Sequence, residues 1–501
     1  MLERHNAPMG QQRGDCPPKR RRMHKNSNPI EIGSRREPIV DHFLIDHLDG
    51  VRLALQKPRD EGPVLRRDKP WEGLMGYFTV IKDGDTYRTY YRGDCNDGTD
   101  GGPDEVTCYA ESADGHHWTK PNLGVVEIEG SRDNNVVLGP ESPAVRHNFT
   151  PFLDTGPARG DLRLKGLGGL FKHDKHDTTT HGLLLYGSDD GIHWRQLREE
   201  PVIDQSHRGP TVTDTCSIPA FWSEVEERYI CYLRDWIGPP KRPGHAGSIR
   251  WIARSTSRDL FTWTPLEKMS YEPVEHLYTS NVVPYFRAPH IAVALPARFM
   301  KGRQVATLEE CRALGLTPDY VEDCSDAVFM TSRGGTAFDR TFEESFIRPG
   351  IGPNNWVTRT NYPATGVVPT GLHEMSLYLM QDNAQKTVHL RRYSLRLDGF
   401  ASVNAPYNGG EMVTRPLILT GSRLEINFST SSAGSIRVEL QEAGGKPLAG
   451  YAIEDAPELV GNHIEKEVTW TQGPDVAHLA GRAVRLRFVM RDADLFALRF
   501  R

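Results

Sequence analysis

The chain has 501 residues, of which 38% are hydrophobic and 25% charged, and its formal net charge is −5. This is ordinary globular composition, and no apolar run approaches the roughly 18 residues that a membrane span needs, so we expect a soluble protein with no membrane span. The acidic balance argues against a nucleic-acid-binding surface. The seven cysteines contain no Cys-x-x-Cys pair, so neither a zinc site nor a disulfide scaffold is indicated.

The first 37 residues are polar and basic, with a Lys-Arg-Arg-Arg run at 19–22. Such a run can direct nuclear import or bind nucleic acid, but a disordered tail is the favoured interpretation. No apolar segment typical of a secretory signal peptide is visible, so the location stays open between the cytoplasm and export from a mis-assigned start. The first strands are expected near residues 44–45 and 51–55.

A short pattern recurs four times and organises most of the chain. It reads strand, Ser, tight turn, closing aromatic residue, with Asp-Gly in the first two turns. The closing aromatic residues are 76, 69 and 75 residues apart, at Trp118, Trp194, Trp263 and Phe338. Each interval has room for four strands, and four-stranded units arranged radially make a β-propeller.

The repeat divides the chain into five units, at residues 71–138, 145–197, 212–266, 278–346 and 355–397. A sixth is possible if the N-terminal strands form a partial blade. In the fourth unit, the capping-box pattern Thr307 to Glu310 predicts a short helix to about residue 314. After residue 399, alternating strands and Gly-rich turns predict a separate β-sandwich. We therefore expect an all-β protein with a tail at 1–37, a five-bladed propeller at 38–398 and a sandwich at 399–501.

This organisation resembles the glycoside hydrolases of families 32, 43 and 68, which combine a five-bladed propeller with a C-terminal β-sandwich. The resemblance covers the chain from about residue 40 and lies in the architecture and the Ser-x-Asp-Gly-x-x-Trp turn. In those families a carboxylate stands at the inner end of each of the first three blades. Their Asn-Asp-Pro-Asn-Gly, Arg-Asp-Pro and Glu-Cys motifs do not occur here, so the resemblance implies a divergent member or a separate related family.

Three carboxylates are candidates for catalysis. Glycoside hydrolysis needs an acid for the leaving oxygen and a carboxylate that attacks or activates water. In a propeller the starts of the innermost strands line the funnel, which points to Glu72 in unit one and Asp214 in unit three. The position of Asp214 matches that of the family's general acid, although the family has Glu there. Glu374, beside His373 in unit five, is the third candidate. Solvated loop charges or strand-entry caps are the structural alternatives.

Unit two has no acid before its first strand, and Arg146 and Asn148 stand there instead. They are candidates for substrate binding, because guanidinium and amide groups bind hydroxyl and carboxylate oxygens. Aromatic rings at strand starts are candidates for sugar stacking. The complete expected substrate-binding set is Trp71, Arg146, Asn148, Asn281, Arg287, His290, Asp326, Arg359 and Tyr362.

These features together predict a glycoside hydrolase that cleaves O-glycosidic bonds in an oligo- or polysaccharide, with no cofactor and no metal. The first alternative is a non-catalytic glycan-binding propeller, which the missing acid of unit two would favour. The second is an Asp-box sialidase, for which Arg146, Arg287 and Arg359 would be the arginine trio. No phosphate-binding Gly-rich loop, HExxH or GxSxG motif occurs, which disfavours nucleotide, zincin and α/β-hydrolase functions.

Overall fold

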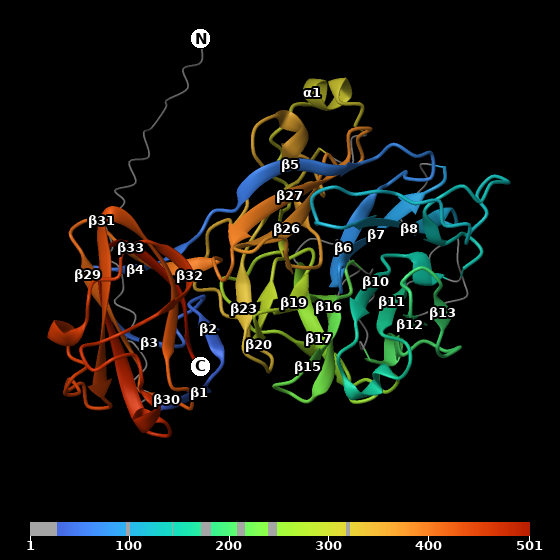
Figure 1. Ribbon diagram of the computed structural model, residues 1–501. Coiled ribbons are helices and arrows are strands. Elements are labelled where there is room, and N and C mark those ends of the chain that lie inside the picture. Colours follow the sequence, from blue (N-terminus) through green and yellow to red (C-terminus); the bar gives the residue numbers. More distant parts are fainter. Residues whose placement is uncertain are drawn as a thin grey trace, which may run out of the picture.

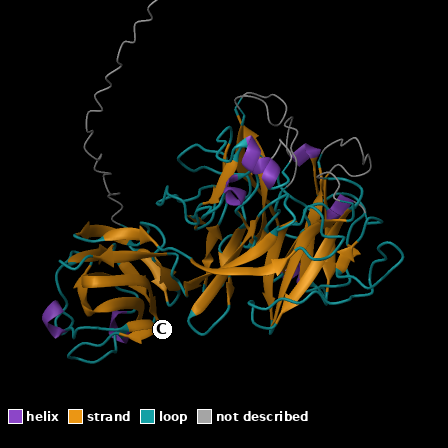
Figure 2. Ribbon diagram, turned by 90° about the horizontal axis from the view of Figure 1, so that it is seen from above, coloured by secondary structure: helices purple, strands orange, loops and turns teal. Residues whose placement is uncertain are grey.

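The computed structural model describes residues 28–96, 101–142, 144–171, 182–207, 216–238, 248–316 and 321–501. A ring of small sheets lies beside a second body of strands that is built mainly from the C-terminal part of the chain (Figure 1). Seen from above, the helices are few and short and lie at the edges of the strands (Figure 2). The predicted all-β fold with a five-bladed propeller is confirmed by the strand pairing within the described residues.

The first three blades are antiparallel sheets of consecutive strands. Blade one holds β6 (Gly76–Asp83), β7 (Thr86–Asp94), β8 (Glu105–Ser112) and β9 (Val136–Leu138). Blade two holds β10 (Thr150–Leu153), β11 (Leu164–Leu170), β12 (Gly182–Ser188), β13 (Arg195–Gln196) and β14 (Ile203–Asp204). Blade three holds β15 (Ala220–Ser223), β16 (Arg228–Ile237), β17 (Ile249–Ser257) and β18 (Glu267–Lys268).

Blade four contains an insertion. Its sheet holds β19 (Val282–Tyr285), β20 (Ala288–Ala294) and β23 (Met330–Ser332). Between β20 and β23 lie the paired strands β21 (Ala297–Met300) and β22 (Cys324–Ala327) and the helix α1 (Leu308–Ala313). The predicted capping box is present, because Thr307 accepts the N–H of Glu310 at 3.1 Å and the Glu310 carboxylate accepts that of Thr307 at 2.7 Å.

The fifth blade joins the two ends of the propeller. It holds β24 (Tyr362–Pro363), β25 (Val368–Pro369), β26 (Glu374–Gln381) and β27 (His389–Arg396), and its outer strand is β5 (Arg59–Arg66) from the start of the ring. Leu65 pairs with Leu390, and Arg391 contacts Asp60, 331 residues earlier in the chain. The ring is therefore closed by strand pairing, and β5 completes blade five instead of starting a sixth.

The first strands of the blades line a central channel and run parallel to one another. Blade five contacts blade one there, with the Val80 N–H donating to Thr365 O at 2.8 Å. A cavity of about 480 Å³ in this channel is lined by residues of all five blades. Four prolines stand on or directly before these strands, because the channel side of an inner strand needs no N–H for pairing. They are Pro151, Pro219, Pro284 and Pro369.

The repeated turn has the same hydrogen bonds in each of its first three copies. Ser112 Oγ accepts the N–H of Gly115 at 2.8 Å, and Asp114 Oδ1 accepts two backbone N–H groups at 2.7 and 2.9 Å. Trp118 Nε1 donates to Gly115 O at 3.2 Å. These contacts recur at Ser188, Asp190, Gly191 and Trp194, and at Ser257, Asp259, Leu260 and Trp263.

The C-terminal strands are β28 (Ala401–Ala405), β29 (Gly410–Thr414), β30 (Leu417–Leu419), β31 (Leu424–Glu442), β32 (Asn462–Glu467) and β33 (Ala483–Phe500). They belong to a ten-stranded sheet together with β1 (Ile30–Gly33), β2 (Arg36–Pro38), β3 (Ile45–Asp49) and β4 (Arg52–Leu55). Its division into two sandwich layers stays a prediction.

The N-terminal strands differ from expectation in their partners. A propeller that begins at residue 38 would include β3 and β4, but these strands pair with β29 and β28 of the C-terminal sheet. The physical reason is apolar burial: Ile32 and Leu44 are each 1% exposed and pack in one cluster with Phe428 and Phe488. The rest of the proposed domain division stays a prediction.

Within the residues that the structure describes, the helices other than α1 are single 3₁₀ turns. In the described residues they are η1 (Ala144–Arg146), η2 (Pro157–Arg159), η3 (Gln205–His207), η5 (Pro353–Trp356), η6 (Ile453–Asp455) and η7 (Ala477–Leu479). Nowhere in this part of the chain does a helix reach the length and apolar character that a membrane crossing requires.

Candidate functional site

The inner strands of the five blades all begin at one end of the propeller, which we call the strand-start end. Buried or half-buried residues at four of these starts have left-handed backbone conformations, with φ of 52°, 52°, 46° and 65° at Tyr77, Asn148, Asn281 and Asn361. Asparagine tolerates this region, but a bulky residue such as Tyr77 is strained there. Backbone strain concentrates at functional sites, so this end is the candidate site.

Two buried carboxylates face each other at the strand-start end of blade one. Asp94 is the last residue of β7 and Glu105 the first of β8, and they are paired across the two strands. Residues directly opposite in an antiparallel pair project from the same face of the sheet. Their exposed fractions are 0% and 1%. Two carboxylates on one face of a sheet can serve as a general acid and a general base for the same ligand.

A hydrogen-bond network fixes Glu105. His147 Nδ1 lies 2.7 Å from Glu105 Oε2, and His147 Nε2 lies 3.0 Å from Asn148 Nδ2. Because an amide nitrogen only donates, Nε2 accepts and Nδ1 carries the proton that bonds Glu105. Arg92 NH1 lies 3.5 Å from Glu105 Oε1 and 3.4 Å from Asn148 Oδ1. The network links blades one and two and compensates the buried charge of Glu105.

Arginines and aromatic rings gather at the strand-start ends of blades three to five, and their tyrosines Tyr278 and Tyr362 belong to the same apolar cluster as Tyr91 of blade one. The Arg234 guanidinium lies 4.3 Å from the ring centre of Tyr278, and that of Arg250 lies 4.9 Å from Trp236 and 5.0 Å from Tyr278. The rings of Tyr278 and Tyr362 are 4.9 Å apart. Burial raises the pKa of Tyr362 well above its usual value, so its hydroxyl stays protonated. These groups offer aromatic faces and N–H donors suited to a polyhydroxyl ligand.

Glu72 is a buried carboxylate whose two oxygens are both bonded within the protein. Its side chain is fully buried, and Tyr91 donates to Oε1 at 2.6 Å. Lys120 Nζ donates to Oε2 at 2.8 Å, and the N–H groups of Asp68 and Lys69 do so at 2.9 and 3.1 Å. Both oxygens therefore have partners within the protein, and the catalytic role expected for Glu72 stays a prediction.

Several expected binding residues also satisfy groups of the protein itself. Trp71 Nε1 donates to Asn135 Oδ1 at 2.8 Å, and Arg146 NH2 donates to a backbone carbonyl at 3.1 Å. Asn281 Nδ2 donates to Pro363 O at 2.7 Å and so links blades four and five. Asn148 and Asn281 lie at the strand-start end, where they hold neighbouring blades together.

Glu374 lies at the other end of the propeller. It is the first residue of β26, whereas Tyr362 at the strand-start end pairs with Met380 near the end of the same strand. Six residues at about 3.3 Å each separate the two ends by about 20 Å. Glu374 Oε1 accepts from Arg392 NH1 at 2.9 Å. The structure therefore does not bring Glu374 together with Asn148 and Tyr362.

Arg287 and His290 lie where the propeller meets the C-terminal sheet. Arg287 bonds Asp398 at 3.0 Å and Glu465 of β32 at 2.9 Å. His290 Nε2 lies 3.2 Å from Glu37 Oε1 of β2. These two residues form bonds between the propeller and the C-terminal sheet, and they lie away from the strand-start end.

The remaining expected residues fall in three places. Asp326 forms a two-bonded ion pair with Arg298 at 2.9 and 2.6 Å on the inserted hairpin. Arg359 is half-buried ahead of β24, close enough to Tyr362 that its charge lowers the pKa of that hydroxyl, opposing the effect of burial. Asp214 lies outside the described residues, and the described chain resumes at Cys216.

Asp94 and Glu105 were not predicted, because the candidate acids were taken mainly from the strand starts of the units. His147 stands between two expected residues, Arg146 and Asn148, and nothing in the sequence marks it as the partner of Glu105. In an antiparallel blade the second strand ends, and the third begins, at the end where the first strand starts. Asp94 and Glu105 occupy those two positions. The sequence signal for these two acids was therefore their position, one at the end of β7 and the other at the beginning of β8.

No family model matches the chain. Two uncharacterized proteins from two strains of Mycobacterium tuberculosis are each 29% identical over 178 residues, which is 35% of this chain. The match covers 52% of each relative, so the chain spans about half the length of the curated relatives it matches.

Among solved structures, a protein named glycoside hydrolase has a TM-score of 0.47 at 11% identity, over 68% of this chain and 92% of its own. A family 43 arabinoxylan arabinofuranohydrolase from Bacillus subtilis, in complex with cellotetraose, has a TM-score of 0.41 at 11% identity. The match covers 86% of this chain and 96% of that protein. An N-acetylgalactosamine deacetylase from F. plautii, in complex with blood group B trisaccharide, has a TM-score of 0.44 at 13% identity. The match covers 70% of this chain and 97% of that protein. The structural neighbours thus include glycoside hydrolases, and the propeller assignment itself rests on the strand pairing.

Proposed function

We propose that the protein is a glycoside hydrolase that binds an oligo- or polysaccharide at the strand-start end and cleaves an O-glycosidic bond there. The observation that carries the proposal is the facing pair of buried carboxylates, Asp94 and Glu105, at the end where the backbone is strained. Glycoside hydrolysis requires two carboxylates that reach one sugar ring.

We assign the general acid to Asp214, on the sequence resemblance, and the base or nucleophile to one of the facing carboxylates. Arg92, His147 and Asn148 are positioning residues, because they contact Glu105 or each other. The arginine and aromatic group around Tyr278 supplies the binding surface for sugar hydroxyls. The propeller channel, which is largely apolar, takes no part in the chemistry.

The test is sugar release from a broad glycan panel, including sulfated and uronate-rich members, by wild type and by D214N, D94N and E105Q. Loss of an acid or base is expected to lower kcat by about 10²- to 10⁴-fold with a smaller effect on KM. Glu127→Gln is the matched control, since that side chain is 59% exposed and lies on a surface loop. Its activity is expected to equal that of wild type.

The variant E374Q tests at which end of the propeller the chemistry takes place. Activity that is lost in E374Q and retained in D94N, E105Q and D214N would place the chemistry at the opposite end and contradict our assignment. Saturable binding of one glycan, with no release from any, would instead favour the non-catalytic binding module.

A further inference from the structure

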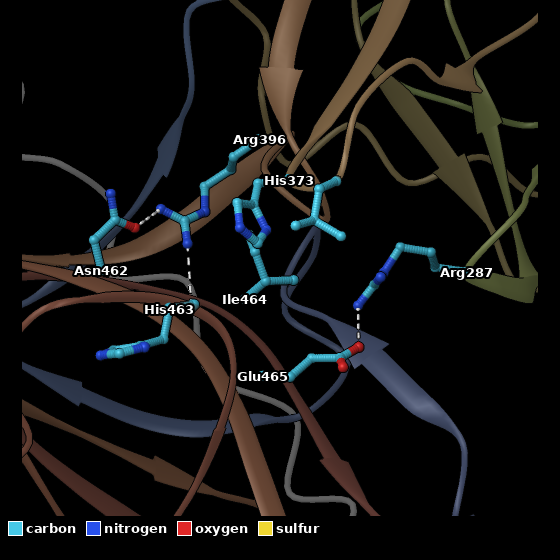
Figure 3. Close-up of a pocket in the computed structure, with 8 residues that line it drawn as sticks. Arg287, His373, Arg396, Asn462, His463, Ile464 and Glu465 are labelled. Carbon is cyan, nitrogen blue, oxygen red and sulfur yellow. Dashed lines mark hydrogen bonds and ion pairs between the residues drawn. The ribbon is translucent and has the colours of Figure 1, made fainter.

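A second cavity lies between the propeller and the C-terminal sheet, away from the strand-start end. Its volume is about 510 Å³. Arg287, His373 and Arg396 form its propeller wall, and residues 462–465 of β32 form the facing wall (Figure 3). An adjoining cavity of about 500 Å³ shares His373 and Arg396 and adds Lys57 and Arg59. His373 and Arg396 therefore stand between two open spaces of similar size.

Arg396 is a partly buried cation whose hydrogen-bond acceptors carry no charge. Its guanidinium bonds Asn427 Oδ1 at 2.8 and 3.1 Å, Asn462 Oδ1 at 2.7 Å and the His463 carbonyl at 3.2 Å. All of these acceptors are neutral, and no carboxylate of the described residues forms an ion pair with it. Burial lowers the pKa of Arg396 to about 10, and the charges of Asp398 and Asp494 only partly oppose this. A buried cation of this kind is stabilised by an added anion.

The other arginine of the cavity differs. Arg287 bonds Glu465 at 2.9 Å (Figure 3) and Asp398 at 3.0 Å, so its charge is already balanced. Arg396 NH1 donates to Asn462, and its second N–H finds no acceptor among the described residues. The His373 side chain is exposed on the same wall and makes no hydrogen bond within the described part of the chain. One guanidinium donor and one imidazole are thus available to a ligand.

We propose that the cleft between the propeller and the C-terminal sheet binds a small oxyanion, carried by a sugar acid or supplied as free sulfate, against Arg396 and His373. A guanidinium binds carboxylate and sulfate oxygens through directed N–H donors, which an ammonium does not reproduce. The two adjoining cavities leave room for a sugar ring that carries the anion. The site is non-catalytic and does not depend on the hydrolase proposal.

The experiment is isothermal titration calorimetry of the full chain at fixed ionic strength with sodium glucuronate, sodium sulfate and glucose. We expect saturable binding of at least one anion and no binding of glucose. R396Q is expected to weaken anion binding about tenfold or more. R396K is expected to weaken binding too, because lysine keeps the positive charge but lacks the planar set of N–H donors of the guanidinium. H373A is the second variant, because it removes a lining side chain without removing a hydrogen bond of the described structure.

Arg491→Gln is the matched control. The Arg396 guanidinium lies 4.2 Å from the ring centre of Phe496, and that of Arg491 lies 4.6 Å from the ring centre of Tyr407, but Arg491 is on the exposed surface of the C-terminal sheet. Binding of glucuronate alone would identify a sugar-acid site, and binding of sulfate alone a site for the free anion; both outcomes support the shared chemistry. Absence of binding by wild type, or binding unchanged in both R396Q and H373A, would overturn the proposal.

Discussion

At the scale of single residues, two buried carboxylates of blade one differ in their hydrogen-bond partners in a way that their positions in the sequence do not show. Glu72 and Glu105 are both acids near strand starts of unit one, and both are buried. Glu72 bonds Lys120, Tyr91 and two backbone amides of its own loop. Glu105 instead bonds His147 of the next blade, where inner strands begin. Sequence could nominate the residue type, but only the fold decides which partners a carboxylate meets.

Glu37 provides a residue-scale prediction about acid stability. Burial alone would raise its pKa, but the hydrogen bond with His290 and the charge of Arg333 outweigh burial and lower the pKa from 4.5 to about 2. The folded state therefore gains stability from ionised Glu37 above pH 4.5, and this gain is lost as the pH falls toward 2. Its size is on the order of 3 kcal/mol, since each pKa unit corresponds to about 1.4 kcal/mol.

E37Q should therefore lower the free energy of unfolding at pH 7 by about 2–4 kcal/mol, because it also leaves Arg333 without one of its carboxylates. Urea unfolding at pH 7, 5, 4 and 3 checks this, and the gap between wild type and E37Q should narrow as the pH falls. Glu31→Gln, on an exposed position of the neighbouring strand β1, should behave like wild type. A gap that stays constant with pH would contradict the assignment.

At the scale of elements, the blades were predictable because their strands are neighbours in sequence. The turn with Ser, Asp and Trp forms its hydrogen bonds within seven residues, so its repetition shows in the sequence itself. Strands that pair with a segment distant in the sequence show no such repeated pattern. Nothing in residues 59–66 indicates pairing with β27, and nothing in residues 45–55 distinguishes a propeller strand from a partner of β28 and β29.

A comparison of two turn glycines, Gly191 and Gly84, gives a prediction at the scale of elements. Both have left-handed backbones, with φ of 77° and 60°. A Cβ at Gly191 would meet Tyr90 Oη at 2.5 Å, whereas one at Gly84 would meet nothing within 4 Å. G84A should therefore cost only the backbone penalty of about 1 kcal/mol, and G191A about 1–3 kcal/mol more from the clash. Thermal unfolding of the two variants measures the difference, and equal losses would refute this account of the turn.

At the scale of the whole molecule, strands β1–β4 and β28–β33 together build the C-terminal sheet, and β5, which follows β4, closes the ring of the propeller. The strands β1–β4 pair with β28, β29, β30 and β33, and β5 then completes blade five. The core of that sheet is therefore shared: most of its buried residues lie between Val403 and Phe500, and the N-terminal strands and the segment between them add Ile30, Ile32, Ile39, Leu44 and Ile45. The apolar cluster of that sheet includes Ile32 and Leu44 as well as Phe428 and Phe488, all at most 1% exposed.

This shared core predicts which fragment folds. Residues 399–501 alone should fail to unfold cooperatively, because they lack the side chains of β1–β4 and expose apolar surface that costs about 25 cal/mol per Å². The same residues fused through a flexible linker to residues 28–57 should regain cooperative thermal unfolding by circular dichroism and dispersed amide signals by NMR. A fusion in which Ile32 and Leu44 are both changed to Asp is the control and should stay unfolded. Cooperative unfolding of 399–501 alone would show that the sheet does not need the N-terminal strands, and would return the domain boundary to the one predicted from sequence.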